Sequence, residues 1–183
     1  MSRIGLAPIS IPKGVKVQVD GSTVTVEGAK GKLSRSFDQD ITIVMKDDKL
    51  VISRSSDERD QRSLHGLSRT LLANMVEGVT KAFVKTLELS GVGFRAQKSE
   101  KGITLQIGFC HTVDFVPPKS INLVIEGNNK ILVSGIDKEE VGQTAAKIRA
   151  LRPPDSYKGK GIIYQGEKVR RKPGKAGKTA LKK

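Results

Sequence analysis

The sequence predicts an α+β protein of two similar domains from an internal duplication, each an antiparallel sheet packed by one main helix, plus a basic C-terminal extension. Short segments of alternating apolar residues precede a stretch with apolar residues three and four apart, and this order occurs twice. The segments ITIVMKDDKLVISRSSDE (41–58) and INLVIEGNNKILVSGIDKEE (121–140) align with a displacement of 80 residues, which becomes 81 after the turn. We therefore expect domains over 1–81 and 82–155 and a basic segment over 156–183.

The first domain begins with strands. In VKVQVDGSTVTV (15–26), valines alternate with polar residues and DGS supplies a turn, which is typical of a β-hairpin. Three further short apolar segments, 33–37, 41–45 and 50–52, predict strands, with KDD turning the last pair.

A helix is predicted from Asp57 to about Gly78. Its expected buried stripe has apolar residues at helical spacing, namely Leu64, Leu67, Leu71, Met75 and Val79. Ser55 and Glu58 have the spacing of a capping box. Three arginines, Arg59, Arg62 and Arg69, lie on the side opposite this stripe, where they form either a solvated face or secondary RNA contacts.

The second domain repeats the order of the first. Strands are predicted over 83–89, 92–96, 103–107 and 113–115, ahead of the repeated hairpin at 121–133. A second helix follows, in which Asp137 pairs with Glu140 as a cap and the buried stripe comprises Val141, Ala145 and Ile148.

The charge of the chain indicates a polyanionic partner. The net charge is +14, and +9 of it falls within 156–183. A basic protein binds polyanions because each neutralised phosphate releases a counterion, which favours nucleic acid or an anionic membrane. No apolar run approaches the roughly 18 residues of a spanning helix and the N-terminus lacks the pattern of a signal peptide, so we expect no membrane partner. The single cysteine, Cys110, permits no internal disulfide and indicates a reduced, cytoplasmic protein.

Two glycine-containing segments resemble nucleotide sites but lack the required context. SGVGFRA (90–96) fits a loose GxGxxA pattern, yet a strand-like segment follows it instead of a helix. AGKT (176–179) ends like a phosphate loop, but the first glycine of such a loop would fall at Lys172. We therefore expect no cofactor and no small-molecule substrate.

Catalytic and metal sites are not predicted either. Cys110 and His111 would suit a nucleophile and a base, with Asp114 nearby, but neighbouring residues of a strand point to opposite faces and do not meet. The chain has two separate histidines, His65 and His111, and no cluster with metal-ligand spacing. We expect no catalytic residue, no metal site and no enzymatic activity.

The C-terminal segment SYKGKGIIYQGEKVRRKPGK (156–175) is the strongest candidate for binding. Lysines and arginines supply charge, glycines permit close backbone approach, and Tyr157 and Tyr164 could stack on a sugar or base. Because Ile162 and Ile163 interrupt the charges, we expect this segment to be partly folded rather than a solubilising tail.

Several motifs resemble one known family. The segment PDSYKGKGI (154–162) resembles the signature of the bacterial-type large-subunit ribosomal protein L-six family, and the following YQGEKVRRKPGKAGK (164–178) is also similar. Further matches are MSRIG at the start, HGLSRTLLANMVEGV (65–79) and GVGFRA. The sequence CHT (110–112) departs from the usual Ser-His-Pro of that family. The resemblance covers essentially the whole chain.

The resemblance implies a non-enzymatic constituent of the large ribosomal subunit. Its partners would be large-subunit rRNA, near the sarcin-ricin stem, the stalk base and the translation-factor region, and neighbouring ribosomal proteins. The implied rRNA contacts are Tyr157, Lys158, Gly159, Lys160, Gly161, Lys168, Arg170, Arg171, Lys172 and Lys175. The residues themselves leave two alternatives open, namely a free RNA- or DNA-binding module with RNA-chaperone activity and an enzyme that acts on nucleic acid.

Overall fold

The structure is a computed structural model, which describes residues 4–46 and 48–175. The chain divides into two compact units. Unit 1 comprises Met1–Phe83 with Ile136–Lys138, and unit 2 comprises Val84–Gly135 with Glu139–Lys183. The bounds of the three predicted segments, 1–81, 82–155 and 156–183, stay predictions.

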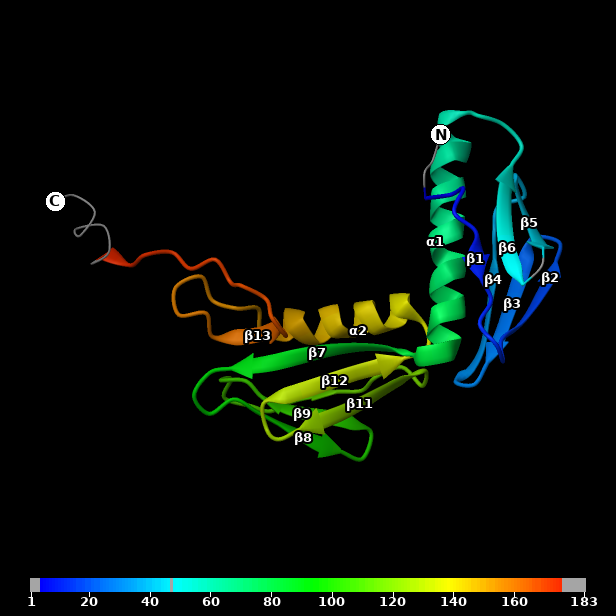
Figure 1. Cartoon of the computed structure of the whole chain (residues 1–183). Coiled ribbons are helices and arrows are strands. Elements are labelled where there is room, and N and C mark those ends of the chain that lie inside the picture. Colours follow the sequence, from blue (N-terminus) through cyan, green and yellow to red (C-terminus); the bar gives the residue numbers. More distant parts are fainter. Residues whose placement is uncertain (1–3, 47, 176–183) are drawn as a thin grey trace. The chain divides into compact units, whose positions relative to one another are not determined.

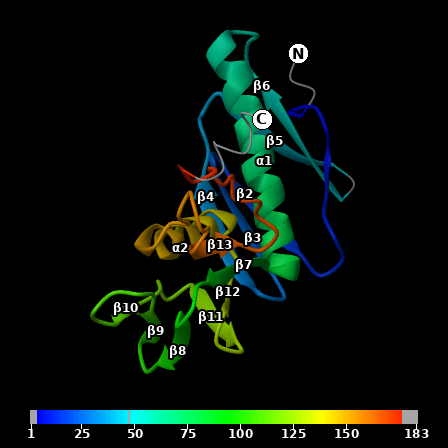
Figure 2. The same cartoon turned by 90° about the vertical axis from the view of Figure 1, so that its left-hand side faces the viewer.

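Unit 1 contains two three-stranded antiparallel sheets and one helix. One sheet has the order β1-β6-β5 and the other has the order β2-β3-β4. The elements are β1 (Ile9–Ser10), β2 (Lys16–Asp20), β3 (Thr23–Gly28), β4 (Gly31–Ser36), β5 (Ile41–Lys46), β6 (Lys49–Arg54) and α1 (Arg59–Lys81). The helix α1 runs alongside these strands and contacts both sheets (Figures 1 and 2). The predicted hairpin, the later strands and the helix are thereby confirmed.

The buried face of α1 differs from the predicted stripe. Of the predicted stripe, Met75 and Val79 are buried and Leu64 and Leu71 pack against the core, but Leu67 is 53% exposed. Leu72, which was not predicted, is fully buried. The inner face also carries His65 and Ser68, so it is turned by about one residue from the prediction. The imidazole of His65 is buried at low cost because both of its nitrogens are hydrogen-bonded.

The hydrogen bonds of His65 indicate which of its ring nitrogens carries the proton. The guanidinium of Arg54 donates to Nδ1 of His65 at 2.9 Å, because arginine has no acceptor. Nε2 therefore carries the proton and donates to the carbonyl of Ile52 at 3.0 Å.

The capping box predicted from Ser55 and Glu58 is wrong. Glu58 is the N-cap of α1 but makes no side-chain capping bond. The side chain of Gln61 accepts instead, from the hydroxyl of Ser55 at 3.1 Å and from the backbone N–H of Ser56 at 2.7 Å. A glutamine of the first turn thus fixes the chain that enters the helix.

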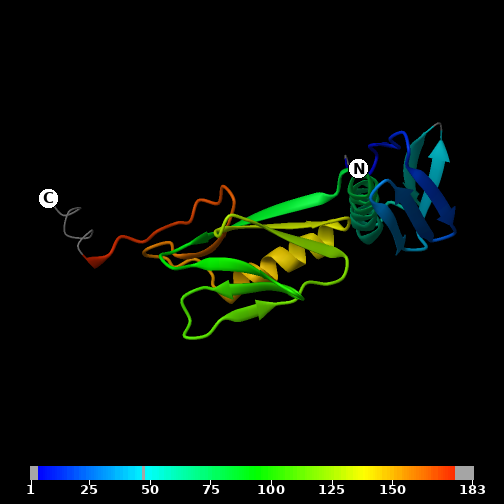
Figure 3. The ribbon, with the colours of Figure 1, turned by 90° about the horizontal axis from the view of Figure 1, so that it is seen from below.

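Unit 2 repeats this architecture with one additional strand. Its sheets have the orders β10-β9-β8 and β11-β12-β7-β13. The elements are β7 (Phe83–Ser90), β8 (Arg95–Ser99), β9 (Gly102–Gln106), β10 (Val113–Phe115), β11 (Ile121–Glu126), β12 (Lys130–Gly135), α2 (Lys138–Leu151) and β13 (Gly161–Tyr164). The helix α2 lies along one face of the larger sheet (Figure 3).

The sheet orders confirm the duplication. The order β1-β6-β5 in unit 1 corresponds to β7-β12-β11 in unit 2, and β2-β3-β4 corresponds to β8-β9-β10. The repeated hairpins are β5–β6 and β11–β12, each followed by the helix of its repeat. The strand β13 comes from the basic C-terminal segment and has no counterpart among the described residues of unit 1.

The core of unit 2 agrees with the predicted helix stripe. Val141, Ala145 and Ile148 of α2 are buried, as expected. The strand predicted at 92–96 begins later, at Arg95, because residues 91–93 form a turn in which Val92 is 90% exposed. This turn also confirms that SGVGFRA does not open a helix, which a dinucleotide site requires.

Candidate nucleic-acid interface

The basic segment is anchored in unit 2 through β13. Its residues pair antiparallel with β7, with Ile162 opposite Leu89 and Tyr164 opposite Leu87. Ile162 is fully buried and its N–H donates to the carbonyl of Arg152 at 2.9 Å, just beyond the end of α2. The expectation that the segment is partly folded is correct, and the surface that it folds against is the sheet of its own domain.

Asp155 fixes the loop that precedes β13. Its carboxylate accepts from the backbone N–H groups of Tyr157 at 3.2 Å and Lys158 at 2.8 Å. These bonds, with that of Lys158 the strongest, lower the pKa of Asp155, so the side chain is ionised at neutral pH. The N–H of Gly159 donates to the Asp155 carbonyl at 3.0 Å and the Asp155 N–H donates to the Lys160 carbonyl at 2.9 Å. The loop bearing Lys158 and Lys160 therefore has a defined backbone.

Glu167 fixes the chain after β13. Its carboxylate accepts from the N–H of Tyr164 at 3.0 Å and from the guanidinium of Arg149 on α2 at 2.7 Å. The Tyr164 bond and then the Arg149 ion pair lower the pKa of Glu167. Arg149 also lies 5.4 Å from the centre of the Tyr164 ring. The one acid of the segment 156–175 is therefore engaged within unit 2.

The chain then folds back across its own loop. The N–H of Lys172 donates to the carbonyl of Ser156 at 2.8 Å. Gly159 is buried beneath the Arg171 side chain, since a Cβ at this glycine would lie 2.8 Å from the Nε of Arg171. This fold-back brings the two halves of the predicted site together, although they lie more than ten residues apart in sequence.

Most of the predicted contact residues are exposed on this fold-back. Tyr157 is 60% exposed, and the exposed cations are Lys158, Lys160, Lys168, Arg170, Arg171, Lys172 and Lys175. Tyr157, Gly174 and Lys175 line one shallow pocket together with Pro173. The resulting surface presents ammonium and guanidinium groups around an accessible aromatic ring, which suits phosphates and bases.

Gly161 serves the loop itself. It has a φ of +150°, and a Cβ would lie 2.7 Å from the carbonyl oxygen of Pro153 and 2.7 Å from the Cα of Pro154. The close backbone approach expected of this glycine is thus made to its own chain.

The three arginines of α1 lie in unit 1 and divide into two kinds. Arg59 and Arg62 are exposed. Arg69 is partly buried and its Nε donates to the carbonyl of Ala7 at 3.1 Å, which ties the N-terminal leader to the helix. Arg69 therefore has a structural partner within the protein, a role that neither of the two sequence interpretations, a solvated face or secondary RNA contacts, included.

The loop between β9 and β10 holds a group that the sequence interpretation missed. The rings of Phe109 and His111 are stacked, with centroids 5.6 Å apart and planes inclined by 8°. The guanidinium carbon of Arg152 lies 5.0 Å from the centre of the Phe109 ring. The two aromatic residues are separated by one residue in sequence, but a distant arginine completes the group, so sequence spacing gives no signal for it.

The expectation that Cys110 and His111 do not meet is wrong. Residues 107–111 form bends rather than a strand, and Sγ of Cys110 lies 3.7 Å from Nδ1 of His111. Asp114 faces elsewhere and accepts from the hydroxyl of Thr104 at 2.5 Å. Asp114, the acid that could orient His111 as a base, is thus bonded to Thr104 instead.

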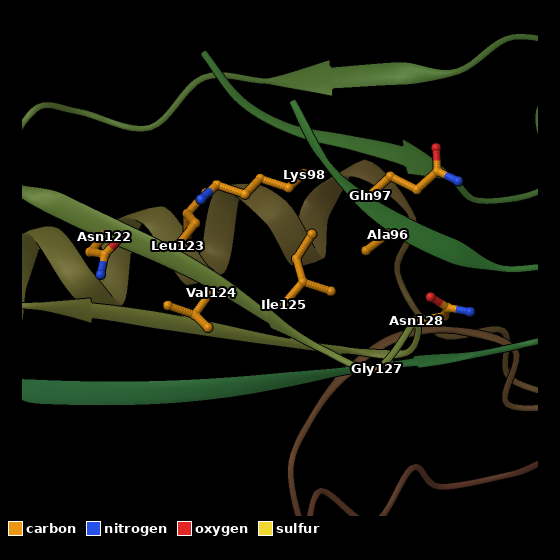
Figure 4. A pocket seen from close by; sticks show the side chains of 9 residues that line it. All are labelled: Ala96, Gln97, Lys98, Asn122, Leu123, Val124, Ile125, Gly127 and Asn128. Atoms are coloured by element: carbon orange, nitrogen blue, oxygen red, sulfur yellow. The ribbon is translucent and has the colours of Figure 1, made fainter. Parts of the chain in front are cut away.

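A groove of unit 2 lies between β8 and β11. Figure 4 shows its lining, with Gln97 and Lys98 from β8 and Leu123, Val124 and Ile125 from β11. Lys98 is the one charged side chain among the lining residues, all of which belong to the described part of the chain. A groove lined by uncharged side chains and one lysine lacks the dense positive charge that suits a polyanion, so we do not count it as part of the candidate interface.

Within residues 4–46 and 48–175, no three His, Cys, Asp or Glu side chains gather in a way that could hold a metal ion. Neither helix of the described chain has the length and apolar character needed to cross a membrane. The AGKT motif at 176–179 lies outside the described residues.

Comparison with known proteins identifies the family. The family described as "Ribosomal protein L6" matches residues 11–82 and 90–165, which correspond to the two repeats. A protein of Moorella thermoacetica is 54% identical over 183 residues, all of both chains. Relatives from Halalkalibacterium halodurans (53% identity, 97% of this chain and all of the relative) and Nostoc sp. (51%, all of both) are similar. All three relatives are named "Large ribosomal subunit protein uL6", and the chain belongs to the Ribosomal protein L6 family.

Proposed function

We propose that this protein is a structural constituent of the large ribosomal subunit and binds large-subunit rRNA through its C-terminal segment. The observation that carries the proposal is the fold-back of residues 153–172, which presents a cluster of exposed cations on a backbone fixed by Asp155 and Glu167. Both acids are engaged in hydrogen bonds to the protein, so they hold the loop in place while the cations remain exposed to solvent. Such an arrangement matches the phosphate backbone of a folded RNA.

The proposed contacts are those predicted from the sequence. The cations Lys158, Lys160, Lys168, Arg170, Arg171, Lys172 and Lys175 neutralise phosphates, and Tyr157 stacks on a base or sugar. Gly159 and Gly161 act by giving the loop its shape. Arg59 and Arg62 make secondary contacts from unit 1, with Arg69 holding the leader beside them.

The position within the subunit is part of the proposal. The proposed site lies near the sarcin-ricin stem, the stalk base and the translation-factor binding region, with other large-subunit proteins as neighbours, as the resemblance of the sequence motifs implies. The family is one of ribosomal proteins rather than of enzymes, as the sequence predicted, and the protein acts in the cytoplasm within the ribosome.

The test is to follow the tagged protein through sucrose-gradient sedimentation at moderate salt and to map its RNA crosslinks. We expect the protein to sediment with large subunits and residues 157–175 to crosslink to large-subunit rRNA. A variant with Lys168 and Arg170 replaced by glutamine should associate less tightly. Sedimentation with free RNA, or crosslinks spread over unrelated RNAs, would instead support the free RNA-binding or chaperone alternative.

A further inference from the structure

The Phe109–His111 pair is an aromatic stack on the surface of unit 2. Phe109 is 38% exposed and His111 is exposed, so neither ring belongs to the core. The rings are close to parallel, at 8°, and lie on the loop of bends between β9 and β10. An exposed aromatic surface of this kind leaves apolar area in water, which a flat partner would cover.

The stack is joined to the candidate interface through Arg152. This arginine lies over the Phe109 ring at 5.0 Å, and its carbonyl accepts the N–H of Ile162 in β13 at 2.9 Å. Arg152 immediately precedes the prolines that open the basic loop. All of these residues belong to unit 2, so the stack and the loop are parts of one compact unit and are connected through Arg152.

We propose that Phe109 and His111 form a stacking platform for one unpaired nucleobase of the bound RNA, with Arg152 supporting the Phe109 ring. The inference rests on the proposed function, because it adds a second kind of contact to the same RNA interface. In RNA-binding proteins, the unpaired bases of single-stranded loops and bulges stack on aromatic rings and guanidinium planes. A base paired within a regular helix has both faces covered, so the ligand is a bulged or loop nucleotide.

Other roles fit the geometry less well. A catalytic role for His111 would require an orienting acid, but Asp114 bonds to Thr104. A role in the core is inconsistent with the exposure of both rings. A purely local role, in which Arg152 and the stack only stiffen the loop, is the remaining alternative, and it predicts no effect on RNA affinity once the protein is folded.

The experiment compares wild-type protein with Phe109→Leu for binding to a large-subunit rRNA fragment that contains unpaired nucleotides, over several salt concentrations. Loss of stacking should weaken binding by about 5- to 150-fold. The slope of log affinity against log salt should stay unchanged, because no phosphate contact is removed. Val124→Ala is the matched control, since Val124 is 44% exposed on β11, and it should bind like the wild type.

A second variant provides a direct signal. The chain has no tryptophan, so Phe109→Trp places a single indole on the platform. We expect RNA to quench its fluorescence, and the variant to bind at least as tightly as the wild type. Equal affinities of folded Phe109→Leu and Val124→Ala, or unquenched indole fluorescence with RNA bound, would overturn the inference alone. Absence of RNA binding by the wild type would overturn the proposed function and the platform with it.

Discussion

Replacement of Gly161 by alanine tests whether the basic segment is built on its own domain. The added Cβ would lie 2.7 Å from both the Pro153 carbonyl oxygen and the Pro154 Cα. These are backbone atoms, so no flexible side chain can move aside. The φ of +150° is also one that residues other than glycine rarely adopt.

The expected cost follows from two effects. An unfavourable backbone conformation costs about 1 to 3 kcal/mol. Displacing the chain also breaks the bond from the buried Ile162 N–H to the Arg152 carbonyl, and a buried group without its partner costs about 1 to 3 kcal/mol. We therefore expect Gly161→Ala to lower the free energy of unfolding of unit 2 by about 2 to 6 kcal/mol.

Tyrosine fluorescence during urea unfolding is a direct assay. The two tyrosines of the chain, Tyr157 and Tyr164, both lie in this segment and no tryptophan obscures them. Gly142→Ala in α2 is the control, because a Cβ there meets nothing within 4 Å and the change should stabilise the helix by about 0.5 to 1 kcal/mol. If Gly161→Ala unfolded at the urea concentration of the wild type, the anchoring argument would be refuted.

Three further predictions concern the helix, the charges and pH. Leu67→Asp should lower the free energy of unfolding by less than about 1 kcal/mol because Leu67 is half-exposed, whereas Leu72→Ala should lower it by about 2 to 5 kcal/mol because Leu72 is fully buried. Circular dichroism melts in which Leu67→Asp is the less stable variant would contradict the observed helix face. Arg170→Gln should reduce the slope of log affinity against log salt by about 0.7 to 0.9, and an unchanged slope would show that Arg170 contacts no phosphate. The Tyr164 N–H lowers the pKa of Glu167 in the folded state, so the ionised carboxylate stabilises the fold above the unfolded pKa near 4.5, and this stabilisation is lost as pH falls through the folded pKa. The stability difference between wild type and Glu167→Gln should therefore shrink below about pH 4.5, and a difference that stays constant with pH would contradict this.

The fold could be predicted because each repeat carries a complete local pattern. Alternation specified the hairpins, and helical spacing specified α1 and α2. The sequence identified most of the buried face of α1 but misplaced Leu67, because polar His65 occupies an inner position that a hydrophobic stripe does not include. Its burial depends on Arg54 and the Ile52 carbonyl, which are supplied by β6. Tertiary partners of this kind leave no periodic signal in the helix itself.

The candidate site was predicted in composition but not in shape. The cations of 156–175 were evident from charge, whereas β13 was not, because GIIY is four residues long and begins with a glycine. Its partner β7 lies about seventy residues earlier in the chain, so no local pattern connects the two. The stack of Phe109 with Arg152 was missed for the same reason.

The position of the acids explains how the segment can be both folded and strongly basic. A disordered basic tail would lose the conformational freedom of every residue that it orders on binding, which costs about 1 to 2 kcal/mol per residue. Here Asp155 and Glu167 hold the backbone before any RNA arrives, through hydrogen bonds from main-chain N–H groups. Because both carboxylates accept hydrogen bonds from groups of the protein, their negative charge is partly engaged within the segment and opposes the exposed cations less than an unpaired acid would. Binding then requires the ordering of lysine and arginine side chains, while the loop that positions them is already formed.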